Sequence, residues 1–157
     1  MEAQTPSTTS ANCIFAVTGV QKDVQEGVRW IRKAVDAGCP NAKTGLGSMY
    51  ATGLGVPKDL HKALQLTSEA AKKGNHAAES NMGVFYVQGL DVAQSTSEAK
   101  KWFEKAAKAG ISEAQFNLGA LYEMGLGVGK DPREAVRLYR LAAERHRRRP
   151  TGPPPDR

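Results

Sequence analysis

Residues 42–75 read AKTGLGSMYATGLGVPKDLHKALQLTSEAAKKGN, and the same pattern returns in residues 78–111, AESNMGVFYVQGLDVAQSTSEAKKWFEKAAKAGI, and in residues 114–147, AQFNLGALYEMGLGVGKDPREAVRLYRLAAERHR. The period is 36 residues, and glycines, tyrosines and alanines recur at matching positions: Gly47, Gly83 and Gly119; Tyr50, Tyr86 and Tyr122; Gly53, Gly89 and Gly125; and Ala70, Ala106 and Ala142. Repeats of this length are typical of solenoids, in which each unit buries its apolar face only against its neighbours. The sequence therefore predicts a repeat array, and such arrays usually offer a binding surface.

Each unit is predicted to form a helix, a loop and a second helix. An Asp or a Ser stands at the expected start of each second helix, where its side-chain oxygen can accept a hydrogen bond from an unpaired backbone N–H group. A glycine follows the alanine-rich last turn in three units, as expected where the backbone turns left-handed. These signals predict second helices at 23–37, 60–73, 96–109 and 132–147, with starts at Asp23, Asp59, Ser95 and Asp131 and with end signals at Gly38, Gly74 and Gly110.

A glycine lies in the middle of each predicted first helix, at Gly47, Gly83 and Gly119, where it costs about 1 kcal/mol relative to alanine. We expect a neighbouring helix to cross there too closely for a side chain. The tyrosines one turn later are expected to fill the adjoining core, at about 2 kcal/mol of burial each. The second helices are expected to contribute their largest core side chains at Trp30, Leu66, Trp102 and Leu138.

The loop between the two helices has the form Gly-x-Gly-Val and superficially resembles a phosphate-binding loop. Gly125, Gly129 and Lys130 fall one residue short of the required spacing, and Asp131 replaces the Ser or Thr that would hold magnesium. We interpret the loop glycines as turn residues, because glycine adopts positive φ without strain. Asp91 replaces the second glycine in the middle unit, and Asp is among the few other residues tolerated there.

The order Ala, Leu-Gly, Tyr, Gly-x-Gly-Val, Asp, Ala, aromatic, Ala-Ala, Gly resembles the Sel1-like repeat family, a relative of the tetratricopeptide repeat. The resemblance covers most of the chain, because GVQKDVQEGVRWIRKAVDAGC from Gly19 aligns with the segment from Gly55 at the same offset. It implies an all-α fold, an α/α solenoid in which antiparallel helix pairs stack into a right-handed superhelix. The implied organisation is a degenerate segment at 1–16, a partial repeat at 17–41, repeats at 42–77, 78–113 and 114–146, and a basic, proline-rich disordered tail at 147–157.

The resemblance also implies a function, that of a noncatalytic adaptor or scaffold that binds a partner peptide or helix. In this class of solenoid the first helices line the concave face, and concave helical arrays accept extended peptides or helices through mixed polar side chains. The alternative is that these positions are solvated surface. The expected partner-binding residues are Thr44, Ser48, Thr52, Asn81, Val84, Gln88, Asn117, Ala120 and Met124.

Catalytic patterns are sparse. The three histidines, His61, His76 and His146, do not recur in register and match no zinc or hydrolase motif. We therefore expect no catalytic residue, no cofactor, no metal site and no small-molecule substrate. Because some members of the family have been described as hydrolases, a repeat-family hydrolase stays open as an alternative.

The net charge of +6 is concentrated near the C-terminus, since residues 144–157 contribute +3 of it. A basic helix end is favourable to the helix dipole, which is the simplest reading. The alternative is that Arg147, Arg148 and Arg149 contact nucleic acid or an anionic membrane. No aromatic residue stands in this tail to stack on bases, which argues against nucleic acid.

The two cysteines, Cys13 and Cys39, lie outside the three full copies. Secreted members of the family are known for a cysteine pair within each repeat, a pattern that is missing here, so we expect free thiols and a cytoplasmic, intracellular location. We expect neither a signal peptide nor a transmembrane segment.

Both ends of the array depart from the repeat pattern. Ala11 and Ile14 occupy the Gly and Tyr positions of the first unit, and His146 stands where the closing glycine is expected. Terminal repeats normally need a polar cap. We therefore expect exposed apolar surface, and with it either self-association or a place in a longer array.

Overall fold

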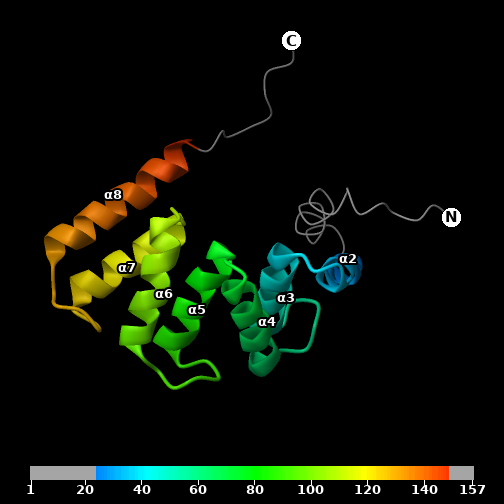
Figure 1. The fold of residues 1–157 in the computed structure, drawn as a ribbon. Coiled ribbons are helices and arrows are strands. Elements are labelled where there is room, and N and C mark those ends of the chain that lie inside the picture. The colour runs from blue at the N-terminus through cyan, green and yellow to red at the C-terminus, as the bar shows by residue number, and fades with distance from the viewer. Residues whose placement is uncertain (1–23, 149–157) are drawn as a thin grey trace, which may run out of the picture.

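The structure is a computed structural model that describes residues 24–148 of the 157-residue chain. These residues form seven α-helices and contain no strand. In chain order the helices are α2 (Val24–Asp36), α3 (Pro40–Thr52), α4 (Leu60–Lys72), α5 (His76–Gln88), α6 (Thr96–Lys108), α7 (Ser112–Met124) and α8 (Pro132–Arg148). Figure 1 shows that the helix pairs stack one after another along the array. The predicted α/α solenoid is confirmed.

The second helices begin and end within one residue of their predicted limits, and the predicted caps explain why. Asp59 and Ser95 each accept a hydrogen bond from the N–H group three residues further along, at 3.1 and 3.3 Å. Asp131 accepts two such bonds from the first turn of α8, at 3.1 and 3.2 Å. Asp23 lies outside the described residues. The predicted end signals Gly38, Gly74 and Gly110 are left-handed, with φ of 84°, 83° and 85°.

The loops between paired helices are turns, as expected. Positive φ occurs in these loops at Gly53, Gly55, Gly89, Gly125 and Gly127. Asp91 is the only non-glycine residue of the described chain with positive φ, at 57°. Its carboxylate lies 2.9 Å from Nδ1 of His61 on α4. The predicted tolerance of Asp at this left-handed position is confirmed.

The mid-helix glycines mark close crossings within each repeat. An added Cβ would lie 2.7 Å from Thr67 Oγ1 at Gly47, 2.6 Å from Phe103 Cδ1 at Gly83, and 2.9 Å from Tyr139 Cε1 at Gly119. Contacts below about 3.0 Å are essentially never made by a real Cβ. The expectation that the partner helix leaves no room for a side chain is therefore confirmed at all three positions.

The three repeat tyrosines join the two helices of their unit. Tyr50, Tyr86 and Tyr122 are half-buried, and each packs against a core cluster. Their backbone carbonyls accept hydrogen bonds from the N–H groups of Asp59, Ser95 and Asp131, at 2.9, 3.0 and 2.9 Å. Each tyrosine thus packs its ring against the core, and its backbone links the last turn of the first helix to the start of the second helix.

The prediction that four large side chains of the second helices lie in the core is wrong for one of them, Trp30. Leu138 is buried, Leu66 and Trp102 are half-buried, but Trp30 is 37% exposed. The neighbouring Ile31, with an exposed fraction of 2%, occupies the core instead. One step along a helix turns the side chain by about 100°, and the smaller, branched Ile31 takes the inward direction on α2.

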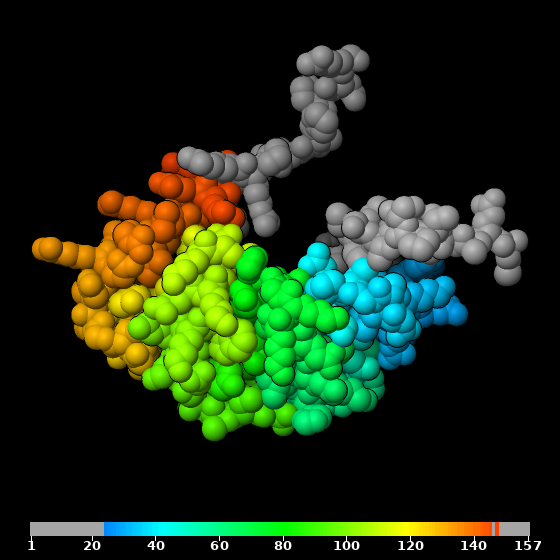
Figure 2. All heavy atoms as spheres, in the orientation of Figure 1, coloured from blue at the N-terminus to red at the C-terminus, as the bar shows by residue number. Residues whose placement is uncertain are grey.

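The array is curved, and its first helices lie closer together than its second helices. Among the described helices, α3 touches α5 and α5 touches α7, whereas α2, α4, α6 and α8 make no such contact with one another. Helices that approach each other must lie on the inner side of a bend, so α3, α5 and α7 form the inner layer. Figure 2 shows the curved outline, with α2 in blue and α8 in orange-red at its two ends.

The expectation of free thiols is wrong for Cys39. This residue precedes α3, has an exposed fraction of 5%, and is disulfide-bonded. The prediction relied on the missing cysteine pair within each repeat, and that pattern says nothing about a disulfide formed by cysteines outside the full repeats. Cys13 lies outside the described residues. None of the helices in residues 24–148 is both long and apolar enough to cross a membrane.

Candidate partner-binding surface

Nine residues of the inner layer were expected to bind a partner, and on α3 the structure supports two of the three as surface. Thr44 is only 8% exposed, and its hydroxyl donates to the Pro40 carbonyl at 3.1 Å. It therefore offers a partner little accessible surface. Ser48 and Thr52 are exposed, and their hydroxyls donate to the Thr44 and Ser48 carbonyls at 3.1 and 2.9 Å. Each hydroxyl oxygen keeps acceptor capacity for a further bond.

On α5 the expected residues fall into three different environments. Asn81 is half-buried, and its Nδ2 donates to Ser48 Oγ at 3.4 Å, a bond between two first helices. Val84 is also half-buried and packs against the core cluster that contains Phe103, so it supports the fold first. Gln88, in the last turn, is exposed. The surface therefore has a polar link in its middle and a free amide at one edge.

On α7 the expected residues become more exposed toward the end of the helix. Asn117 and Ala120 are half-buried, and Met124 is 59% exposed. Because α3, α5 and α7 are side by side, the exposed members Ser48, Thr52, Gln88 and Met124 belong to one face. We call these four residues together with Asn81 and Asn117 the inner surface. It offers hydroxyl and amide groups beside a flexible apolar side chain.

The ionisable groups near the inner layer are mainly structural. Lys43 of α3 forms an ion pair with Glu69 of α4 at 2.8 Å, and the hydrogen bond from Lys43 holds the pKa of Glu69 below its usual value. Glu79 is buried and contacts Nδ1 of His76 at 2.8 Å. These pairs tie helix positions together. Among residues 24–148 no group of three or more His, Cys, Asp or Glu side chains is placed to hold a metal ion.

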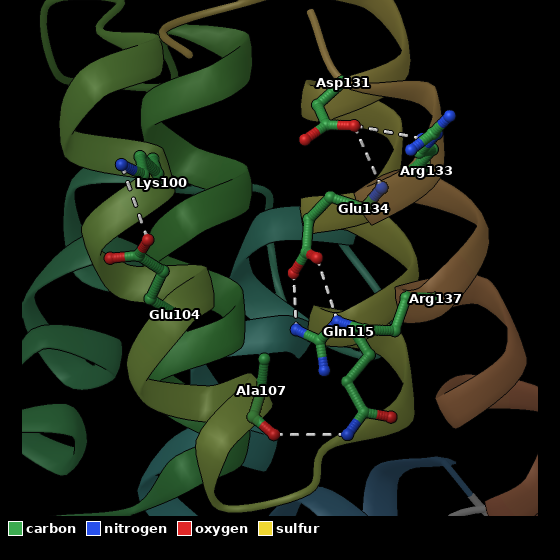
Figure 3. Close-up of polar contacts among 8 residues, drawn as sticks. All are labelled: Lys100, Glu104, Ala107, Gln115, Asp131, Arg133, Glu134 and Arg137. Atoms are coloured by element: carbon green, nitrogen blue, oxygen red, sulfur yellow. Dashed lines mark hydrogen bonds and ion pairs between the residues drawn. The ribbon is translucent and has the colours of Figure 1, made fainter. Parts of the chain in front are cut away.

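A cavity of about 270 Å³ on the other side of the array was not predicted. It lies between α6, α7 and α8 and is lined by Glu104, Ala107, Lys108, Gln115, Leu118, Tyr122, Glu134, Arg137, Leu138 and Leu141. Figure 3 shows its polar contacts: Gln115 Nε2 donates to the Ala107 carbonyl at 3.2 Å, and Glu134 pairs with Arg137. The hydrogen bond from Arg137 lowers the pKa of Glu134. A signal was present in the sequence, because Leu138 stands where the preceding unit has the larger Trp102.

A second feature is the apolar face beyond α7, which agrees with the expectation of exposed apolar surface at an end of the array. Thr44 and Ser80, which occupy matching positions on α3 and α5, are 8% and 1% exposed, but Phe116 at the same position of α7 is 56% exposed. Its ring lies 5.1 Å from that of Tyr139 on α8. Tyr139 donates a hydrogen bond to Glu123, which raises the pKa of the tyrosine. No further described helix covers this face.

Comparison with known proteins identifies the repeat. The family model described as Sel1 repeat matches residues 17–39, 40–75, 76–111 and 112–146. No curated protein matches the chain.

Three solved structures are similar. A Sel1 repeat protein from Oxalobacter formigenes is 35% identical with a TM-score of 0.76, over 89% of this chain and 58% of its own. A protective antigen from uropathogenic Escherichia coli strains, which displays an SLR fold, is 29% identical with a TM-score of 0.75, over 88% and 31%. A putative Sel1 repeat protein from Klebsiella pneumoniae shares the fold at 17% identity and a TM-score of 0.61, over 89% and 76%.

This chain thus spans 58% and 31% of the first two of these relatives. Repeats of this kind generally mediate protein–protein interaction, and the proteins that carry them are typically noncatalytic. Four adjoining matches that run from residue 17 to residue 146, on a fold shared with solved Sel1 repeat proteins, show that the chain belongs to the Sel1 repeat family.

Proposed function

We propose that this protein is a noncatalytic adaptor that holds a peptide or helix of another protein on its inner surface. The observation that carries the proposal is the contact between neighbouring first helices, which gathers Ser48, Thr52, Gln88 and Met124 on one face. Hydroxyl and amide groups can bond the backbone of an extended segment, and a flexible methionine adapts to different side chains. Thr44 is left out of the proposed contact set because it is buried, and Val84 because it packs in the core.

The test is affinity capture with two matched variants. Asn81, Gln88 and Asn117 are changed together to alanine in one variant, and Gln65 and Arg140, exposed on second helices, in the other. We expect proteins retained by the wild type and by the outer variant to be lost from the inner variant, while both variants keep the wild-type thermal unfolding midpoint within a few degrees. Equal capture by all three proteins would overturn the proposal.

A second proposal concerns self-association through the apolar face around Phe116. A ring that is 56% exposed at a position buried in the two preceding units provides apolar surface that a second copy can cover. This contact uses the end of the array and leaves the inner surface open.

The alternatives have less support. Two histidine–carboxylate contacts are present, His61 with Asp91 and His76 with Glu79, and they lie apart from each other in the array. Among the described residues, neither is accompanied by a third group that would support a hydrolase site. Of the three tail arginines only Arg147 has a described side chain, which is exposed, so nucleic acid or membrane contact stays an untested alternative.

The cytoplasmic location also stays a prediction. It was based on free thiols, and the disulfide at Cys39 is of a kind that persists in oxidising compartments. Fractionation of cells that express the native protein decides between the two settings.

A further inference from the structure

The cavity between α6, α7 and α8, which we call the α6–α8 pocket, has the size of one large side chain. Its volume is about 270 Å³, whereas pockets that hold drug-sized molecules or cofactors occupy roughly 300–1,000 Å³. Its inner walls are apolar, because Leu118 and Leu138 belong to one core cluster and Ala107 and Tyr122 pack against it. A group that enters must therefore be compact and largely apolar.

The preceding unit shows what fills such a space. At the matching place between α4 and α6, Trp102 packs against a cluster that includes Ala71, Ala78 and Met82. Between α6 and α8 the matching residue is Leu138, and the walls are of similar kind, with Ala107 in the place of Ala71. A leucine occupies less volume than an indole, so the α6–α8 pocket is the space that a tryptophan would fill.

A buried acceptor points to the polar part of the ligand. Gln115 is 6% exposed, its Nε2 donates to the Ala107 carbonyl, and its Oε1 is buried without a hydrogen-bond partner. An unpaired buried acceptor has lost its hydrogen bonds to water without gaining others, which destabilises the protein. At the matching positions of the preceding units Lys43 and Glu79 are both paired, each at 2.8 Å. Of the three residues at this position, Gln115 alone has a buried acceptor atom, Oε1, without a hydrogen-bond donor in the described chain.

The charges at the rim balance one another. Glu134 pairs with Arg137 on α8, and Lys100 pairs with Glu104 on α6 at 3.5 Å (Figure 3). Lys108, which also lines the pocket, has no such partner within residues 24–148, but the lining as a whole carries two acidic and two basic side chains and therefore does not favour a charged ligand. It leaves specificity to the apolar walls and to the Gln115 oxygen.

We propose that the α6–α8 pocket binds a tryptophan side chain presented by a partner protein, with the indole N–H donating to Gln115 Oε1. An indole combines a large apolar ring with a single donor and no acceptor, which matches the pocket in both respects. This site lies between α6, α7 and α8, and none of its lining residues belongs to the inner surface. Either proposal can fail without the other.

The binding test uses the full chain labelled with ¹⁵N and the probe N-acetyl-tryptophanamide. We expect saturable shifts of the Gln115 side-chain amide and of backbone amides in α6 and α8. N-acetyl-phenylalaninamide, which lacks the ring donor, should bind about tenfold more weakly, because it leaves Oε1 unpaired. Absence of saturable shifts, equal binding of the two probes, or shifts confined to other helices would each overturn the proposal.

Variants separate pocket filling from general surface effects. Leu138→Trp supplies the missing ring from within, so it should weaken probe binding at least tenfold and raise the unfolding midpoint. Val136→Trp adds the same side chain at an exposed position of α8 and should leave binding unchanged. Gln115→Leu, which does not depend on the fit of a new ring, should abolish the preference for tryptophan over phenylalanine. Normal binding by Leu138→Trp, or a retained preference in Gln115→Leu, would contradict the assignment.

Discussion

At the scale of single residues, the glycines of the first helices differ sharply in what they tolerate. A Cβ on Gly83 would meet the Phe103 ring, which has an exposed fraction of 1% and little freedom to move. A Cβ on Gly45, in the same kind of helix, would meet nothing within 4 Å. The two positions therefore form a matched pair for substitution.

We predict that Gly83→Ala lowers the free energy of unfolding by about 1–3 kcal/mol, the usual cost of overpacking. Gly45→Ala should raise it by up to about 1 kcal/mol, since alanine is the better helix former. Urea denaturation of both variants measures the difference. A stabilised Gly83→Ala protein would show that the Phe103 ring can move aside.

Asp91 allows the cost of its left-handed backbone to be isolated. Asp91→Gly and Asp91→Ala both remove the contact with His61, so they differ in backbone freedom and in the added methyl group. With φ of 57°, alanine should be less stable than glycine there by about 1–2 kcal/mol. Thermal unfolding of the two variants measures this gap, and equal midpoints would refute the strain.

The sequence predicted backbone requirements better than side-chain directions. Glycine and Asp residues at left-handed positions act through local geometry, so the sequence of the turn itself indicates them. The crowded mid-helix glycines depend on a facing helix, and they were predicted because a costly residue recurs at one position of three repeats. Trp30 was misplaced because the neighbouring Ile31 competes for the same core space, and that competition is decided by the facing helix. The disulfide at Cys39 was missed for a related reason, since it depends on proximity after folding.

At the scale of helices, the ion pair between Lys43 and Glu69 links α3 to α4. The pKa of Glu69 is held below its ordinary value of 4.5, chiefly by the hydrogen bond from Lys43. A carboxyl whose pKa is lowered by folding stabilises the protein above the unfolded pKa, and this contribution is lost as the pH falls through the folded pKa. Because Glu69 is 43% exposed, the contribution is within the usual range of about 0–1 kcal/mol for surface pairs.

We predict that Lys43→Met reduces stability at pH 7 and that its difference from the wild type disappears as the pH falls below about 4.5. The control Lys58→Met changes an exposed lysine and should show no such pH-dependent difference. Chemical denaturation between pH 3 and pH 7 provides the data. If the stability difference between Lys43→Met and the wild type is constant over this range, the contribution of Lys43 comes from packing of its aliphatic chain and not from the ion pair with Glu69.

The inner surface and the α6–α8 pocket were predictable to different degrees. The inner surface follows from the helix order, so its residues were named in advance, although Thr44, named with them, proved buried. The pocket arises from the volume difference between Leu138 and Trp102 in one register. That difference in side-chain volume is visible in the sequence. It produces a cavity only if α6 and α8 do not move closer together to fill the space.

At the scale of the whole molecule, the apolar face around Phe116 governs association. We predict that the wild type forms dimers at concentrations where Phe116→Ser is monomeric, because the ring is the largest exposed apolar group on α7 or α8, which bound this face. Leu54→Ser, in the loop after α3, removes a similarly exposed apolar side chain and should leave the dimer intact. Sedimentation velocity over a concentration series distinguishes these outcomes, and a monomeric wild type would reject the prediction.

The neighbour-only pattern of helix contacts has a consequence for how the chain folds. Every contact between described helices joins elements that are adjacent or one apart along the chain. Contact order is therefore low, and each step of assembly closes only a short loop, which favours rapid folding. Formation can start at any helix pair and spread in both directions, so a growing chain can consolidate one unit before the next is synthesised.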